Sequence, residues 1–381
     1  MNRSEAVKLL DRIHGRHSLN GMTEENWREA WADIQDSFTG TQFYHLLRMD
    51  RMDLVPSWLQ SELKAESDRV LFQNMLIRSE LKKLLKAFDA AKIPVIPLKG
   101  IRMAERYFGH FAARPTTDLD LLVNPQDLER ASKLLSGMDF QQDDSPDSDH
   151  FHLLFNKFYD NPMFPFLAVE LHWDILRSHA SDTDTGGLWE RSQPYPGYAG
   201  VRELSDEDSL YHICLHGFNH QMLSLKYILD VARLVVETAP SLRWATMTAR
   251  ARKDGNYSKL ITVLSLVYSL CPSLEKIKPL PERKRWPLWN EELMREAGLG
   301  LKSRRYYFFR LLSIFVMYDS AGAMLNHLRY LFLPPRDYAR SQFREDKGGS
   351  LLSLYTRIYR IRLRNLFGGG AARAGTKEYD I

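Results

Sequence analysis

The stretch from Ile93 to Val123 constrains this chain most, because it ends in an apolar strand that carries two carboxylates. The strand reads Asp118-Leu119-Asp120-Leu121-Leu122-Val123. Side chains alternate between the faces of a strand, so Asp118 and Asp120 point the same way while leucines enter a core. Their Cα atoms are expected about 6.5 Å apart. Both carboxylates can therefore reach one divalent cation, or share two ions about 3.5–4 Å apart.

A glycine-containing loop precedes this strand. Lys99 and Gly100 follow a short apolar run and lead into a helical segment, and Arg114 comes just before Asp118. The glycine permits close backbone approach, and the start of the helix offers free N–H groups to an anion. Lys99 can neutralise a phosphate oxygen, and Arg114 can clamp phosphate or orient Asp118. Simple ion pairs to the carboxylates are the alternative for both cations. This order of elements favours a site that grips a polyphosphate and holds Mg²⁺ on its phosphates.

A third carboxylate is expected on a neighbouring strand. Residues 167–173 and 151–158 form a predicted antiparallel hairpin, in which Glu170 and His172 share one face. Glu170 can complete a two-metal site and help to deprotonate an attacking hydroxyl. The alternative is a glutamate at a sheet edge that faces water.

These motifs together resemble a known family. Lys99-Gly100, Tyr107, Arg114, the strand from Asp118 to Val123, and Glu170-Leu171-His172-Trp173 are similar to motifs of the uncharacterised bacterial nucleotidyltransferase family of the polymerase-β superfold. The resemblance extends weakly from about residue 70 to 365. It implies a nucleotidyltransferase whose metal ligands are Asp118, Asp120 and Glu170, with Mg²⁺ or Mn²⁺ as the ion. Ile101 follows Gly100 where the wider superfamily has Ser or Gly, so the phosphate loop departs from the common pattern.

We expect an α+β protein with a small mixed-sheet core. Residues 1–69 are predicted as helices that cover one face of a catalytic domain at 70–180. A Gly- and Pro-rich linker or surface loop at 181–201 leads to a helical domain at 203–366 and a flexible tail at 367–381. Pro94 and Pro97 cannot donate to a sheet ladder, so the first strand, Ile93–Leu98, should be short, irregular or at an edge.

The predicted helix after Ser205 carries a row of imidazoles. His212, His216 and His220 recur every four residues and therefore share one helix face. Such a face can bind zinc, can lie beside the active site on the acceptor side together with His172, or can serve only helix packing.

Composition excludes several classes of protein. Two cysteines, Cys214 and Cys271, are too few and too distant for a disulfide framework or a zinc knuckle. The charged N-terminus does not match an export signal, and no apolar window reaches the ~20 residues of a membrane span. A cytoplasmic enzyme is therefore expected.

The charge is uneven along the chain. Residues 301–381 hold 15 Lys and Arg against 6 Asp and Glu, within a total formal charge of +4. A basic amphipathic helix is predicted there, with Arg357, Arg360, Arg362 and Arg364. It can contact a membrane surface or RNA, or be the solvated face of a packed helix.

The predicted function is transfer of an NMP from an NTP to a small-molecule or peptide acceptor. Family members of this kind resemble tailoring enzymes of biosynthetic gene clusters, so a nucleic acid acceptor is possible but not favoured. Two alternatives stay open: a toxin-like nucleotidyltransferase that modifies tRNA or protein, and a non-catalytic nucleotide-binding scaffold.

Overall fold

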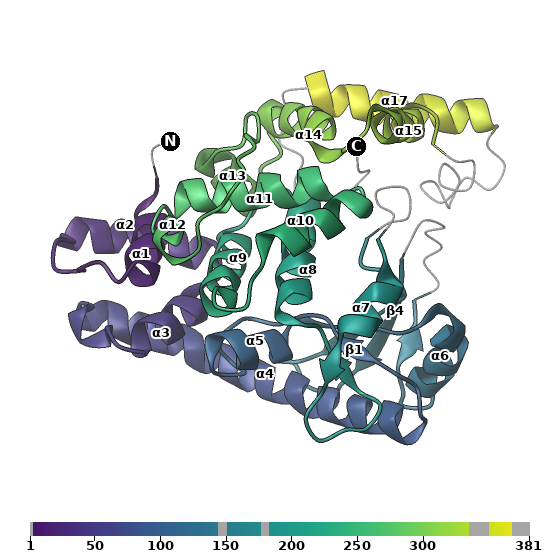
Figure 1. The fold of residues 1–381 in the computed structure, drawn as a ribbon, viewed down its shortest axis with the longest axis horizontal. Coiled ribbons are helices and arrows are strands. Elements are labelled where there is room, and N and C mark those ends of the chain that lie inside the picture. Colours follow the sequence, from purple (N-terminus) through teal and green to yellow (C-terminus); the bar gives the residue numbers. More distant parts are fainter. Residues whose placement is uncertain (1–2, 144–150, 177–182, 335–349, 368–381) are drawn as a thin grey trace.

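The computed structural model describes residues 3–143, 151–176, 183–334 and 350–367, and it shows many helices around one mixed sheet (Figure 1). The helices of two turns or more are α1 (Glu5–His14), α2 (Glu24–Asp36), α3 (Gly40–Arg48), α4 (Ser57–Ala90), α5 (Ile101–Phe108), α6 (Leu128–Ser136), α7 (Thr185–Arg191), α8 (Asp206–Asn219), α9 (Leu225–Thr238), α10 (Trp244–Lys253), α11 (Tyr257–Leu270), α13 (Glu291–Gly298), α14 (Arg304–Met317), α15 (Ala321–Phe332) and α17 (Leu351–Phe367). The predicted α+β class is confirmed.

The main sheet consists of β1 (Ile96–Pro97), β2 (Asp118–Leu122), β3 (Gln141–Gln142), β4 (His152–Phe158) and β5 (Phe166–His172). Its strand order is β1-β2-β5-β4-β3, and only β2 and β5 pair in parallel. β1 is short and lies at an edge, as its prolines predict. The predicted hairpin is also present, as the antiparallel pair β4 and β5. A separate two-stranded ribbon joins β6 (Gln193–Pro194) and β7 (Arg202–Glu203).

One face of the main sheet is closed by α4 and α6. Leu119 and Leu121 of β2 lie in one buried cluster with Val169 and Leu171 of β5 and with Leu84 of α4. These side chains alternate with the carboxylates along the strands, so the charged residues are forced onto the opposite face. Burial of the leucine face thus sets the direction in which the acidic residues point.

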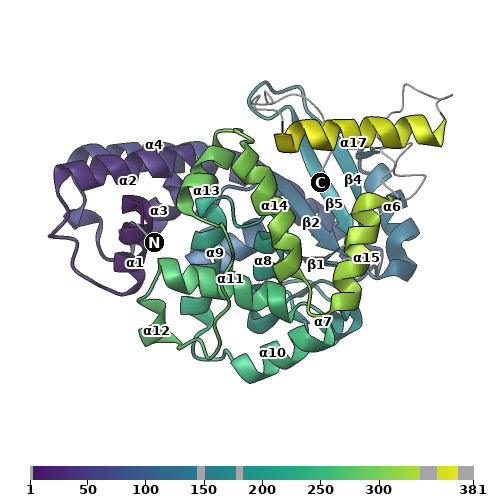
Figure 2. The same cartoon turned by 90° about the horizontal axis from the view of Figure 1, so that it is seen from above.

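A second hydrophobic core joins the N-terminal helices to helices of the second half of the chain. Leu10 of α1 and Phe43 of α3 share it with Leu229 of α9 and Leu264 of α11. The helices α1–α3 pack against one another, against α4 and against the later helices α9, α11 and α13, and α3 also contacts α5 (Figure 2). That residues 1–69 cover one face of the catalytic domain stays a prediction. The residues that cover the sheet belong to α4 and α6, because the apolar stripe of α4 lies in its C-terminal half.

Two predicted boundaries differ from the observed elements. The boundary between residues 69 and 70 falls inside α4, a single helix of 34 residues that contributes to both cores. The predicted linker at 181–201 contains α7 and β6, and Leu188 of α7 is buried, because this segment packs on the helical core. The predicted tail lies outside the described residues apart from Phe367. Within the parts of the chain that the structure describes, no helix has the length and apolarity needed to cross a membrane.

Candidate active site

The two aspartates of β2 lie on the sheet face opposite to α4. Asp120 is almost fully buried, with 2% of its side chain exposed, whereas Asp118 is 29% exposed. Asp118 therefore sits at the mouth of the site and Asp120 at its floor. The pair reaches this arrangement because Leu119 and Leu121 are held in the core behind it.

Glu170 completes a group of three carboxylates. In the parallel pairing of β2 with β5, Glu170 lies directly opposite Asp120. Ligand oxygens of Asp118, Asp120 and Glu170, hereafter the carboxylate cluster, all lie within 4.8 Å of one another. Glu170 is 28% exposed, so the cluster is open to a ligand on its Asp118–Glu170 side.

Lys99 supplies a cation to this cluster. Its Nζ lies 3.3 Å from Oδ2 of Asp118 and 3.1 Å from Oδ1 of Asp120. Burial alone would lower the pKa of Lys99, but the two aspartates outweigh burial and hold that pKa above its ordinary value. Lys99 is therefore an ammonium placed where a phosphate group could exchange for an aspartate as its partner.

Gly100 is required by the backbone at the start of α5. Its φ is +72°, and an added Cβ would lie 3.1 Å from Cγ2 of Thr116. Only glycine adopts this conformation without strain.

His172 joins the carboxylate cluster itself. Its Nε2 lies 3.2 Å from Oδ1 of Asp120 and 3.1 Å from Oε2 of Glu170. Burial would lower its pKa, but these hydrogen bonds raise the pKa of His172 to about 9. The predicted place of His172 was the acceptor side, and the structure places its ring between two carboxylates.

Lys99 and His172 lower the pKa values of the neighbouring carboxylates. Burial acts to raise the pKa of Asp120, but Lys99 and His172 outweigh burial and lower it. For Glu170, the bond from His172 outweighs burial and lowers the pKa to about 2. Both groups are therefore ionised at neutral pH, as a metal site requires.

Arg114 has a different partner from the one predicted. Its guanidinium forms a bidentate pair with Asp230 of α9, with Nε 3.0 Å from both carboxylate oxygens and Nη2 2.9 Å from Oδ2. Gln42 of α3 donates to the same carboxylate. Arg114 is 3% exposed. It ties the loop before β2 to the helical core behind the site.

The imidazoles of His212 and His216 in α8, and of His220 directly after its last residue, lie on the helical side of the carboxylate cluster. Ser205 caps this helix by accepting a hydrogen bond from the N–H of Asp208. The rings of His216 and His220 lie 4.7 Å apart, and His220 stacks on Tyr227. Burial lowers the pKa of His212 to about 3, and the charges of Asp120, Lys99 and His172 act on that ring. His212 is therefore a neutral imidazole beside the charged cluster.

Lys226 is a site residue that sequence reasoning missed. It lies in the first turn of α9 and has no ion-pair partner among the residues that the structure describes. Burial, with Arg114 as the next cause, lowers the pKa of Lys226 to about 7, and Asp118 and Lys99 also act on it. The sequence offered one indication of its place: Lys226 precedes Asp230 by four residues, so the two side chains share a face of α9.

The residues present fit a divalent cation. Three carboxylates are the ligand chemistry that Mg²⁺ and Mn²⁺ prefer. Oδ2 of Asp120 is buried and has no hydrogen-bond partner within the described parts of the chain. A buried carboxylate oxygen without a partner is costly, and a cation bound there would satisfy it.

Comparison with known proteins points the same way as this geometry. The sequence pattern that defines a family described as "Uncharacterised nucleotidyltransferase" matches residues 23–271, which includes every site residue named above. Neither a curated protein nor a solved structure gives a significant match. The chain belongs to this family of uncharacterised nucleotidyltransferases.

Proposed function

We propose that this protein is a metal-dependent nucleotidyltransferase that moves an NMP from an NTP to a small-molecule or peptide acceptor. The observation that carries the proposal is the carboxylate cluster, with Asp120 and Glu170 directly opposite each other on parallel strands. In the reaction, a nucleophile of the acceptor forms a bond to the α-phosphorus. The bond from that phosphorus to the bridging oxygen breaks, and pyrophosphate leaves with the electron pair.

The carboxylate cluster is the proposed metal site. Bound there, Mg²⁺ or Mn²⁺ would neutralise phosphate charge and stabilise the transition state. Glu170, which is more exposed than the buried Asp120, is the proposed ligand of the metal ion nearer the acceptor.

Two lysines are the proposed phosphate ligands. Lys99 lies on the sheet side of the site, and Lys226 lies on the helical side, where no carboxylate of the described residues pairs with it. Ammonium groups on two sides can hold the leaving pyrophosphate. We assign Arg114 a positioning role instead of the predicted phosphate contact. Its guanidinium already pairs with Asp230, and the side chain is buried.

The helical half is the proposed acceptor side. His216 and His220 present neutral or weakly charged imidazoles next to the charged cluster, together with the phenol of Tyr227. Imidazole and phenol groups can donate or accept hydrogen bonds, which suits a polar acceptor better than a second phosphate group.

The direct test is mass spectrometry of a candidate acceptor pool after incubation with each of the four NTPs and Mg²⁺ or Mn²⁺. An NMP adduct on a small molecule or peptide, absent with Asp118→Asn, supports the proposal. An adduct on tRNA would instead support the toxin-like alternative. Metal-dependent NTP binding by calorimetry without any transfer would support the non-catalytic scaffold.

A further inference from the structure

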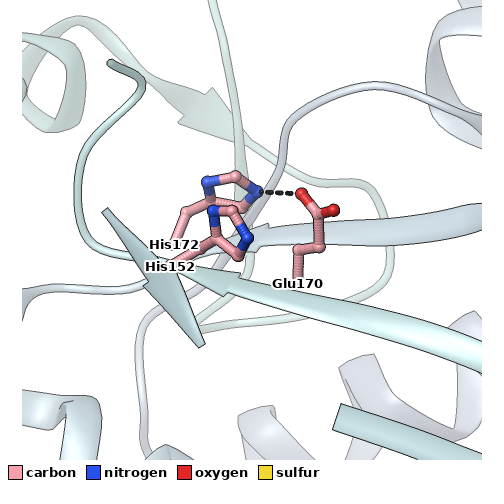
Figure 3. A group of neighbouring side chains, drawn as sticks. All are labelled: His152, Glu170 and His172. Carbon is pink, nitrogen blue, oxygen red and sulfur yellow. Dashed lines mark hydrogen bonds and ion pairs between the residues drawn. The ribbon is translucent and has the colours of Figure 1, made fainter. Parts of the chain in front are cut away.

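A second group of possible metal ligands lies beside the carboxylate cluster and contains two imidazoles. In the antiparallel pairing of β4 with β5, His152 lies directly opposite His172. Glu170 precedes His172 by two residues, so all three side chains share one sheet face. Figure 3 shows the two rings and the carboxylate converging from neighbouring strands. We call His152, Glu170 and His172 the His–Glu–His cluster.

The distances in this cluster suit a metal ion. One ligand atom from each residue lies within 4.8 Å of the others, and the ring centroids of His152 and His172 are 5.0 Å apart. Metal–ligand bonds of about 2.0–2.1 Å place tetrahedral ligands roughly 3.4 Å from one another. Side-chain rotations that bring the atoms together by up to about 1.4 Å therefore complete the site without a change in the backbone.

The ligand chemistry differs from that of the carboxylate cluster. Two imidazoles and one carboxylate are typical of Zn²⁺ and similar transition-metal ions, whereas three carboxylates suit Mg²⁺. His172 is 5% exposed, and its Nδ1 has no hydrogen-bond partner in the part of the chain that the structure describes. A buried ring with one nitrogen left unsatisfied indicates that its present hydrogen bonding is incomplete.

We propose that the His–Glu–His cluster binds a transition-metal ion at a second site, which shares Glu170 with the carboxylate cluster. Zn²⁺ should bind there more tightly than Mg²⁺ or Co²⁺. This inference rests on the proposed function in one respect: the neighbouring carboxylate cluster is taken to be a nucleotide site. Glu170 bridges the two ions when both are present. The ion at the second site therefore changes the affinity of the carboxylate cluster for Mg²⁺.

The test measures Zn²⁺ binding to the full chain by calorimetry, without NTP or acceptor. The wild-type protein should bind one Zn²⁺ that excess Mg²⁺ does not displace. His152→Ala should weaken binding by at least about 100-fold, because one of three ligands is lost. Asp118→Asn and the exposed-site control His17→Ala should bind Zn²⁺ as the wild type does.

Co²⁺ in place of Zn²⁺ gives an optical check that does not depend on enzymatic activity. Wild-type protein should show the intense visible bands of four-coordinate Co²⁺, and His152→Ala should lose them while its melting temperature stays near that of the wild type. If His152→Ala fails to fold, His152→Gln, which keeps the polar side chain, takes its place. Equal Zn²⁺ binding by wild type and the His152 variant would overturn the proposal. Loss of Zn²⁺ binding in Asp118→Asn would also do so, by assigning Zn²⁺ to the carboxylate cluster. Neither result bears on nucleotidyl transfer, which the acceptor experiment tests separately.

Discussion

The site has a buried aspartate on each side, Asp120 on the sheet side and Asp230 on the helical side, and the two differ in their hydrogen-bond partners. On the helical side, both oxygens of Asp230 accept from Arg114, and Gln42 adds another hydrogen bond. On the sheet side, Oδ1 of Asp120 is shared between Lys99 and His172, while Oδ2 has no partner in the described part of the chain. Two buried carboxylates therefore differ in how completely they are paired.

This difference separates a structural pair from a reactive site. A bidentate pair that is fully satisfied loses nothing when no ligand is present, and a single substitution breaks it at high cost. An incompletely satisfied carboxylate beside two cations can exchange partners when a metal and phosphates arrive. The comparison predicts that substitutions on the two sides will affect different measurements.

The largest expected effect is loss of catalysis on the sheet side. Asp118→Asn should reduce the rate of NMP transfer at least about 10³-fold, because it removes a metal ligand and transition-state charge. The free energy of unfolding should change by less than about 1 kcal/mol, since Asp118 is partly exposed and Lys99 keeps Asp120 as its partner. Steady-state kinetics and urea unfolding measure the two quantities. The exposed-site variant Asp53→Asn should change neither, and transfer by Asp118→Asn near the wild-type rate would end the metal-site hypothesis.

The next effect is on stability and lies on the helical side. Asp230→Asn should lower the free energy of unfolding by about 3–5 kcal/mol, because it leaves the buried Arg114 without its counter-charge. The double variant Arg114→Met with Asp230→Leu should recover most of this loss, since neither charge remains. Urea unfolding of the three proteins gives the comparison. If Arg114→Met instead stays stable and binds NTP poorly, Arg114 contacts phosphate as first predicted.

Lys226 tests whether the helical side also contributes to nucleotide binding. Lys226→Met should weaken binding of Mg-NTP about 10- to 100-fold, the range for a lost charge-assisted hydrogen bond. The pKa of Lys226 is about 7 before the ligand binds, so the side chain gains its proton as the pH falls. Wild-type affinity should therefore strengthen from pH 9 to pH 7, by up to about tenfold per pH unit.

The Lys226→Met variant should lose that part of the pH dependence, and the exposed-site control Lys82→Met should keep it. Calorimetric titrations at several pH values measure both. A wild-type affinity that does not vary between pH 7 and pH 9 would remove Lys226 from the phosphate site.

The smallest expected effects concern the imidazoles of α8. His216→Ala or His220→Ala should raise the acceptor KM by roughly 3- to 10-fold, the value of one neutral hydrogen bond. The affinity for Mg-NTP should stay within about threefold of wild type. Kinetics with each substrate varied in turn separate the two. Weaker NTP binding with unchanged acceptor kinetics would reverse the assignment of the two sides, and unfolding of both variants would favour helix packing alone.

Local patterns in the sequence predicted the sheet side well. The alternation of Asp118, Leu119 and Asp120 with the core determines which face each side chain takes, and this depends only on strand geometry. The edge position of β1 followed from the missing N–H groups of its prolines. The placement of Glu170 beside Asp120 needed only the hairpin and one parallel pairing.

Long-range packing accounts for what the sequence did not reveal. Arg114 was expected near Asp118, but Asp230 lies 116 residues away in the chain, and no local pattern links them. Nothing in the sequence around Lys226 distinguishes it from other helix lysines, because its proximity to Asp118 and Lys99 depends on how α9 packs. The break expected between residues 69 and 70 was missing because α4 continues through a polar stretch that packs against α3, a contact that no local pattern reveals.

The core shared by α1–α3 with α8–α14 has a consequence for synthesis of the protein on the ribosome. Most partners in this core come from residues 6–63 and 204–309, with a smaller share from 96–188, so the first helices emerge long before many of the segments that bury them. At about 5–20 residues per second, the delay between the two groups is roughly 7–28 s. During that interval the face of α1 that packs against α9 and α11 lacks those partners, which makes the nascent N-terminal segment a client for chaperones.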